Sequence, residues 1–239
     1  MIVLSVDSSS KCATAALLKD DMLLGEYTLN NKREHSVLLM GIIEQLLNDT
    51  GVSIDDVDGF VVSKGPGSFT GLRIGMATVK GLSFGSNKPY VSVSTLEGLA
   101  FSISSFDGII CPIMDALREN VYTAIYKVID GKMEAIIDCT SMDIEELVEK
   151  LNSMNEKVLF TGDGVSKHKD YLLEHMQNIS FAPVHLNTVR ASQIGEIGLN
   201  LLKNGIKDDE NSAPLYLKKP QAVRELENRL KMTNGESNS

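Results

Sequence analysis

The stretch IVLSVDSSSKCATAALL, residues 2–18, decides the fold because a second stretch repeats its pattern. An apolar run ends at Asp7, and another resumes at Ala13 after a polar turn. Farther along the chain, the run IICPIMD ends at Asp115 and the next one resumes at Val121, again six residues later. Apolar runs of this length, bounded by turn residues, are typical of strands. Each stretch therefore predicts a strand, a turn that begins with an aspartate, and a second strand.

A second landmark repeats in the same order. FVVSKGPGS (60–68) and VLFTGDGVS (158–166) both predict a buried strand that enters a glycine-containing turn before a helix. A repeat of this length, about 100 residues, is too long for a solenoid. We therefore expect an α/β fold of two similar subdomains around a cleft, each a mixed sheet flanked by helices. The expected boundaries are residues 1–106 and 107–220, followed by a polar and flexible tail at 221–239.

Composition excludes several classes of protein. The formal net charge of −9 opposes unassisted binding to nucleic acid, although residues 218–239 are basic on balance. The three cysteines, Cys12, Cys111 and Cys139, lack the spacing of a zinc site and favour neither a metal nor a disulfide framework. The N-terminus has no basic segment before its apolar run, so it predicts neither a signal peptide nor a membrane span. These features predict a cytoplasmic protein with no membrane partner.

The two aspartate turns resemble those of the actin, sugar kinase and Hsp70 (ASKHA) superfamily, whose fold is ribonuclease H-like and whose turns face ATP phosphates. On that resemblance Asp7 and Asp115 would serve a Mg-ATP site, one as a metal-water ligand and the other as a general base, with Gly162 and Gly164 as further cofactor-binding candidates. Phosphate-cradling turns usually need glycine, and DSSSKC and DALREN contain none. Aspartates that close a hairpin are therefore the favoured interpretation, and an ATPase is the alternative.

The segment SKGPGSFTGLRIG (63–75) matches neither GxxxxGK[ST] nor GxGxxG. On the helix that it opens, Gly71 and Gly75 share one side, which predicts close approach by a neighbour. Leu72, Met76 and Val79 lie on the opposite side.

The helix before this segment carries an apolar arc of about 200°, twice what a surface helix commonly needs. Packing of the two helices within the domain and a subunit interface both explain the excess. The candidate interface residues are Leu38, Leu39, Met40, Ile42, Ile43, Leu47, Leu72, Met76 and Val79.

Over about the first 220 residues, the ordered motifs IVLSVDSSS, GPGSFTGLRIGMATVKGLSF, VSTLEGLA, MDALRENVYTAIY, TGDG and APLYLKKP resemble the TsaB (YeaZ) family. The resemblance implies an actin-like fold and a non-catalytic partner of TsaD. With TsaD and the ATPase TsaE, the family supports threonylcarbamoylation of N6 of adenosine 37 in tRNAs that read codons beginning with A.

The resemblance also implies what this chain lacks. The metal-binding HxxxH of TsaD would fall at Thr95 and Leu99, neither of which can act as an imidazole ligand. We therefore expect no catalytic residue and no cofactor in this chain, with ATP and metal held by partner subunits. The implied partners are TsaD, TsaE, a second copy when TsaD is absent, and tRNA only through the complex. On the interface hypothesis, Met76→Glu should abolish the pair with TsaD.

Overall fold

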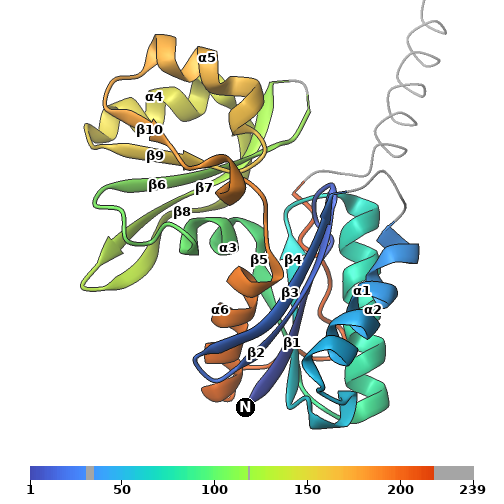
Figure 1. The fold of residues 1–239 in the computed structure, drawn as a ribbon. Coiled ribbons are helices and arrows are strands. Elements are labelled where there is room, and N and C mark those ends of the chain that lie inside the picture. Colours follow the sequence, from blue (N-terminus) through green and yellow to red (C-terminus); the bar gives the residue numbers. More distant parts are fainter. Residues whose placement is uncertain (31–34, 118, 218–239) are drawn as a thin grey trace, which may run out of the picture.

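The computed structural model describes the chain except for residues 31–34, 118 and 218–239 (Figure 1). The expected tail at 221–239 lies outside the described residues. In chain order the elements are β1 (Ile2–Asp7), β2 (Cys12–Lys19), β3 (Met22–Asn30), α1 (His35–Thr50), β4 (Gly59–Gly65), α2 (Phe69–Ser86), β5 (Tyr90–Ser94), α3 (Thr95–Phe101), β6 (Ile109–Asp115), β7 (Asn120–Ile129), β8 (Lys132–Asp143), α4 (Ile144–Met154), β9 (Val158–Thr161), α5 (Val165–His175), β10 (Ile179–Phe181) and α6 (Ala191–Lys203). Short 3-10 turns lie at Ile54–Asp56 and Val184–Leu186.

The strands form two five-stranded mixed sheets with the same topology. The first has the order β3-β2-β1-β4-β5 and the second the order β10-β9-β6-β7-β8. In each, an antiparallel three-stranded meander is joined through its first strand, β1 or β6, to a parallel pair. This duplicated architecture confirms the predicted pair of actin-like subdomains.

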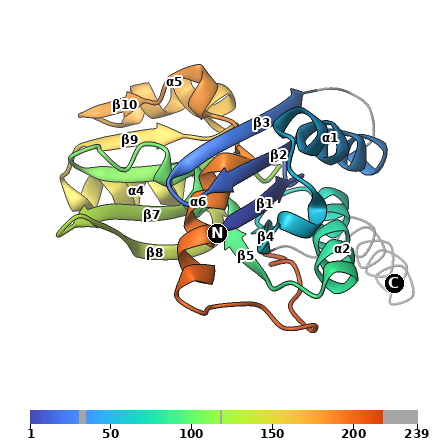
Figure 2. The ribbon, with the colours of Figure 1, turned by 60° about the horizontal axis from the view of Figure 1, so that its bottom comes forward.

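Apolar side chains form three core clusters, two of which lie on opposite faces of the first sheet. One is covered by α1 and α2 and contains Leu4, Phe60 and Val62. The other, the central cluster, lies under α6 and α3 and also includes Ile110 and Tyr126 of the second sheet. The third lies under α4 and α5. Figures 1 and 2 show α1 and α2 on one side of the first sheet and α6 on the other.

Helix α6 returns to the first sheet, so the expected division of the chain at residue 107 needs a correction. It packs on β1, β2, β4 and β5, and its first turn is bonded by Glu26 of β3, whose Oε1 accepts from Ser192 N at 2.9 Å and from Ser192 Oγ at 2.7 Å. The physical reason is that the first sheet needs apolar cover on both faces, and α1 and α2 supply only one. Residues 107–220 therefore do not form one contiguous subdomain.

The segment after α6, residues 206–217, is here named the strap. It runs along α2, where Lys80 Nζ donates to Glu210 O at 2.7 Å and Arg73 Nε donates to Tyr216 Oη at 3.0 Å. Leu215 N donates to Lys64 O at 2.6 Å, at the end of β4. The described part of APLYLKKPQA, residues 213–217, therefore lies against the N-terminal end of α2.

Most of the predicted interface residues are instead core residues, which corrects that hypothesis. Leu39, Ile42, Ile43, Leu72, Met76 and Val79 are buried against the first sheet, and Leu38 and Leu47 pack partly buried against the same cluster. Met40, at 49%, is the only one of the nine predicted interface residues that is exposed. The wide apolar arcs arise because each helix contacts both the sheet and its neighbouring helix. Met76→Glu would therefore unfold the domain rather than report on a partner.

Candidate functional site

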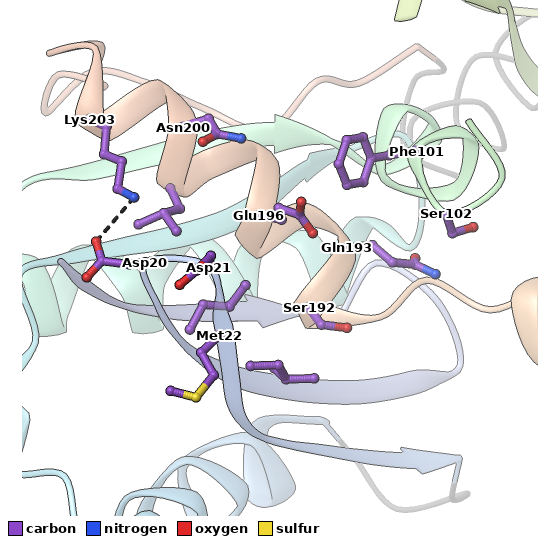
Figure 3. Close-up of a pocket in the computed structure, with 13 residues that line it drawn as sticks. Asp20, Asp21, Met22, Phe101, Ser102, Ser192, Gln193, Glu196, Asn200 and Lys203 are labelled. Carbon is purple, nitrogen blue, oxygen red and sulfur yellow. Dashed lines mark ion pairs between the residues drawn. The ribbon is translucent and has the colours of Figure 1, made fainter. Parts of the chain in front are cut away.

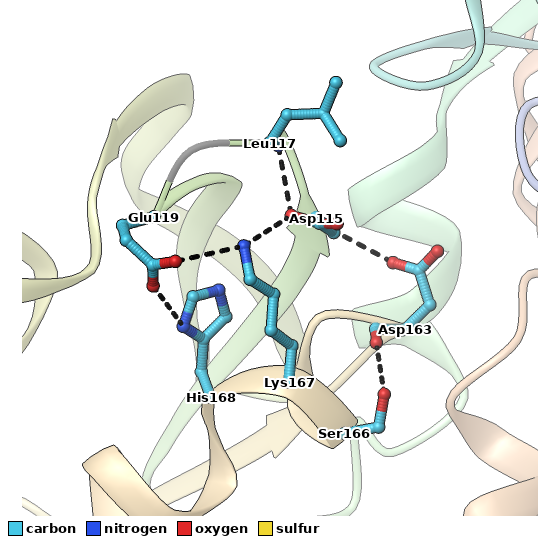
Figure 4. Close-up of polar contacts among 7 residues, drawn as sticks. All are labelled: Asp115, Leu117, Glu119, Asp163, Ser166, Lys167 and His168. Atoms are coloured by element: carbon cyan, nitrogen blue, oxygen red, sulfur yellow. Dashed lines mark hydrogen bonds and ion pairs between the residues drawn. The ribbon is translucent and has the colours of Figure 1, made fainter.

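Asp7 and Asp115 end β1 and β6, and the turns that they begin are close enough for Lys11 of the first to act electrostatically on Asp163 beside the second. Asp163, in the turn after β9, belongs to the second of these groups (Figure 4). Burial raises the pKa of the Asp163 carboxyl, while the Asp115 N–H and the Lys11 ammonium of the first turn act against that rise. The charge of the first turn thus acts on the second.

The first turn uses its polar groups to hold α2. Ser9 N donates to Asp7 Oδ1 at 3.3 Å, and Ser9 O accepts from Ser68 N at 2.6 Å. Ser8 Oγ donates to Gly71 O at 2.8 Å. A Cβ on Gly71 would lie 1.9 Å from Ser8 O, which confirms the prediction that glycine here permits close approach. The N-terminus of α2 is capped by Ser68 Oγ, which accepts from Gly71 N at 3.3 Å.

The second turn is bonded in the same manner. Asp115 N donates to Asp163 Oδ1 at 3.2 Å, and Gly164 N donates to Ile113 O at 3.1 Å. A Cβ on Gly162 would lie 2.2 Å from Ile113 O. Gly162 and Gly164, the cofactor candidates, therefore let the β9–α5 turn approach β6 closely. Since the N–H groups of Asp115 and Gly164 already have acceptors in the protein, the turn does not present them to an anion.

Helix α5 adds a charged group beside Asp115. Lys167 Nζ lies 3.3 Å from Asp115 Oδ1 and 3.6 Å from Glu119 Oε1. His168, only 2% exposed, places Nδ1 3.9 Å from Glu119 Oε2. Burial lowers the pKa of His168, and the Lys167 ammonium adds to the lowering. The two carboxylates neutralise the charge of Lys167 within the chain, and burial keeps the His168 imidazole uncharged (Figure 4). This arrangement therefore favours a structural role for these residues over a catalytic one.

Thr95 and Leu99, where the resemblance would place the metal ligands of TsaD, are buried on α3. Helix α3 packs between the two sheets and against α6, where a Cβ on Gly98 would lie 2.5 Å from Ile194 Cγ2. The described residues contain no group of three or more His, Cys, Asp or Glu side chains placed to hold a metal ion. Helix α3 thus acts as packing between the subdomains.

Sequence reasoning missed the exposed side of α1 and α2. Phe84 is 88% exposed, and Ala77 and Gly81 lie beside it on the same side of α2. Within the described part of the chain, Cβ atoms placed on Gly41, Gly81 or Gly85 would meet no atom within 4 Å. We name this region the outer helical surface and define it by Met40, Gly41 and Glu44 of α1 and Ala77, Gly81, Phe84 and Gly85 of α2. The signal available in the sequence was glycine inside two long helical patterns.

A groove of about 630 Å³ lies on the other side of the first sheet, between α6, the β2–β3 turn and the end of α3 (Figure 3). Met22 and Leu23 line it and are 56% and 50% exposed. Asp20 closes one end by pairing with Lys203 at 3.2 Å and with the N-terminal ammonium at 2.9 Å. None of the residues singled out from the sequence lies in it.

Among the described residues, no helix has the length and apolarity needed to cross a membrane.

Comparison with protein families matches residues 22–226 to the model of TsaD, described as tRNA N6-adenosine threonylcarbamoyltransferase. The chain is 38% identical over 172 residues to the tRNA threonylcarbamoyladenosine biosynthesis protein TsaB of Bacillus subtilis (strain 168), which covers 72% of this chain and 75% of that protein. TsaB of Escherichia coli (strain K12) is 30% identical over 133 residues, 56% of this chain and 52% of that protein.

A solved structure shares the fold over nearly its whole length. YeaZ from Pseudomonas aeruginosa superposes with a TM-score of 0.77 at 24% identity, covering 90% of this chain and 99% of that one. Among catalytic relatives, the tRNA N6-adenosine threonylcarbamoyltransferase of Geobacter sp. (strain M21) is 31% identical over 114 residues, 41% of this chain and 33% of that enzyme.

Proposed function

Since this chain belongs to the TsaB (YeaZ) family of tRNA threonylcarbamoyladenosine biosynthesis proteins, we propose that it serves in that synthesis as a non-catalytic subunit that binds TsaD. The modification is the threonylcarbamoylation of N6 of adenosine 37 in tRNAs reading codons that begin with A. TsaE joins the complex, and tRNA is contacted through it, since the net charge of −9 disfavours direct binding. A second copy of the chain takes the place of TsaD when TsaD is absent.

The exposed glycines of α1 and α2 carry this proposal. Glycine inside a helix costs about 0.5–1 kcal/mol relative to alanine, and none of the residues that the structure describes lies close enough to Gly41, Gly81 or Gly85 to require it. Small residues on a helix surface let a second backbone approach closely. Phe84, 88% exposed at the same surface, is an aromatic anchor of the kind that dominates protein interfaces. The outer helical surface therefore replaces the buried residues as the proposed TsaD contact.

Two features support a non-catalytic role. Thr95 and Leu99 stand where the related enzyme has imidazole ligands, and both are packed in the core. The N–H groups of Ser9, Asp115 and Gly164 in these turns donate to acceptors within the chain, which disfavours the ATPase alternative. We propose that this chain requires no cofactor and that ATP and metal belong to partner subunits.

The interface is tested with Ala77→Arg in the full chain. Ala77 is exposed, so the substitution should leave folding unchanged while placing a charged, bulky side chain in the contact. We expect the affinity for the organism's TsaD, measured by calorimetry and by gel filtration of the mixture, to fall about 100-fold. Ala135→Arg, at an exposed position on β8, is the matched control and should bind normally. Wild-type affinity in Ala77→Arg would reject the interface.

The ATPase alternative has its own test. Calorimetry of the isolated chain with Mg²⁺ and ATP should show no micromolar binding. Micromolar binding that disappears in Asp7→Ala would favour the alternative.

A further inference from the structure

The groove beside the β2–β3 turn combines apolar side chains with carboxylates. Met22 and Leu23, at the start of β3, line it and are 56% and 50% exposed, so they leave an apolar wall open to solvent. Phe101, at the end of α3, adds an aromatic ring (Figure 3). Asp21 of the turn and Glu196 of α6 add two carboxylates from different elements. The groove therefore presents apolar contact and negative charge within one space.

The negative charge of the groove is only partly neutralised by the described residues. Asp20 pairs with Lys203 at 3.2 Å and with the N-terminal ammonium at 2.9 Å, so those two cations already have a partner. Asp21 and Glu196 form no ion pair with any residue that the structure describes. An incoming cation would therefore meet two carboxylates whose charge is not yet compensated.

Two further basic residues lie near the groove in the sequence but do not line it. Arg190, just before α6, has its guanidinium 3.9 Å from Glu26 of β3. Lys19 follows Leu18 on β2, and because successive side chains of a strand point to opposite faces, it points away from the face that Leu18 shares with the groove. Neither cation therefore opposes the charge complementarity with a basic ligand.

The shape of the groove suits a side chain carried by a protein better than a free small molecule. Small-molecule pockets commonly enclose about 70–90% of their ligand, whereas Met22 and Leu23 in this wall are themselves half exposed. Strand β3 is an edge strand of the first sheet, so among the described residues no strand lies beyond it. A protein segment can therefore reach the groove from the side of β3.

The chemistry of the lining fits an arginine. A planar guanidinium can donate to carboxylates and stack on an aromatic ring such as that of Phe101. The alkyl stem of the same side chain covers apolar surface such as Met22 while its charged end stays at the carboxylates. Arginine thus uses both kinds of contact that the groove provides.

We propose that this groove binds an arginine side chain presented by a protein partner, with the guanidinium donating to Asp21 and Glu196. The groove lies on the face of the first sheet that α6 covers, whereas α1 and α2 lie on the opposite face (Figures 1 and 2). A partner in the groove therefore leaves the outer helical surface open, and the proposal does not depend on the proposed contact with TsaD.

The site is tested by NMR of the full chain labelled with ¹³C at the methionine methyl groups. Met22 is the reporter, and its resonance is assigned by its loss in Met22→Leu, while Met154 on α4 is the internal reference. The probe is the peptide acetyl-Leu-Arg-Leu-amide. Its control carries citrulline, which has the shape of arginine without the charge. We expect a saturable shift of the Met22 methyl with the arginine peptide, and about 10-fold weaker binding of the citrulline peptide.

Equal binding of the two peptides would reduce the groove to an apolar contact and overturn the proposal. Absence of a Met22 shift with the arginine peptide overturns it as well.

Asp21→Asn combined with Glu196→Gln removes both charges and keeps the size of the side chains. We expect the arginine peptide to bind this variant about 10-fold more weakly than the wild type. Asp170→Asn combined with Glu174→Gln makes the same two changes at exposed positions on α5 and should keep the wild-type affinity. Wild-type affinity in the groove variant, or an equal loss in both variants, overturns the proposal. Urea unfolding checks that both variants fold.

Two other occupants give distinct results. If ethylguanidinium binds with the affinity of the arginine peptide, the groove takes a free small cation and the partner segment is rejected. If the Met22 resonance moves with protein concentration when no peptide is present, a second copy of the chain covers the groove, which also overturns the proposal. Because none of these measurements contains TsaD, their failure leaves the proposed function standing.

Discussion

Gly71 shows that a glycine in a turn-helix motif can serve packing rather than ligand binding. The β1–β2 turn lies so close to α2 that a Cβ on Gly71 would sit 1.9 Å from Ser8 O. That oxygen belongs to the backbone, so it cannot move aside as a flexible side chain could. The glycine therefore fixes the position of α2 on the first sheet.

Gly71→Ala should destabilise the protein by about 2–4 kcal/mol, since the helix or the turn must shift to make room. Urea unfolding followed by circular dichroism measures the loss. Gly81→Ala, the same chemical change on the same helix with no described atom within 4 Å of the new Cβ, is the control and should not destabilise. Equal stability of Gly71→Ala and the wild type would contradict the contact.

His168 makes stability depend on pH. Burial lowers its pKa below the ordinary 6.5, and Lys167 lowers it further. Between those two pKa values the unfolded chain binds more protons than the folded one, so the stability contribution is present above pH 6.5 and is lost as pH falls through the folded pKa.

We expect the free energy of unfolding to decline from pH 7 to pH 5 and to decline less in His168→Gln, which cannot take up the proton. Urea titrations at a series of pH values measure both slopes. His185→Gln, at an exposed histidine, is the control and should keep the wild-type slope. An unchanged slope in His168→Gln would show that another group causes the decline.

At the scale of elements, helix α2 separates stability from binding. Its inner side, with Leu72, Met76 and Val79, is buried on the sheet, whereas a Cβ placed on Gly81, on its outer side, would meet no atom of the described residues within 4 Å. Gly81→Ala should therefore stabilise the free chain by about 0.5–1 kcal/mol, because alanine loses less backbone entropy. The same substitution should weaken TsaD binding by keeping the partner backbone at a distance.

Thermal unfolding of the free chain and calorimetry with TsaD measure the two effects. Lys80→Ala, at a position tied to the strap rather than on the outer helical surface, serves as the comparison for changes in helix propensity. If Gly81→Ala stabilises the chain but leaves the TsaD affinity unchanged, the exposed glycines do not serve close approach by a partner.

The helices also show which features of the structure can be predicted from the sequence. The repeated strand-aspartate-turn pattern predicted both sheets because strand periodicity and turn residues are local signals, and the close approach at Gly71 followed from residue spacing. The inner and outer sides of α2 could not be told apart, since Leu72 and Met76 have the composition of either a core or an interface. The expected bounds 107–220 place α6 with the second subdomain, which is wrong, because its apolar face, which includes Ile194, does not encode which sheet it covers.

At the scale of the whole molecule, the two subdomains share a core. The central cluster joins Val61 of the first sheet to Ile110 of the second, with Ile194 of α6 and Leu96 of α3 between them. Glu26 of β3 bonds the first turn of α6 and so ties it to the first sheet. A core shared in this way should make the two sheets unfold together.

Ile194→Ala tests this coupling. Ile194 is fully buried and lies so close to α3 that a Cβ on Gly98 would come within 2.5 Å of it, so truncation leaves a cavity at the junction of both subdomains. We expect a loss of about 2–4 kcal/mol, seen equally in the hydrogen exchange of the slowest amides of β1 and of β6. Leu172→Ala, in the cluster under α4 and α5, should also lower the exchange protection of the slowest amides in both β1 and β6 if unfolding is cooperative. Loss of protection in β1 alone after Ile194→Ala would mean that the subdomains open independently and that α6 stabilises only the first.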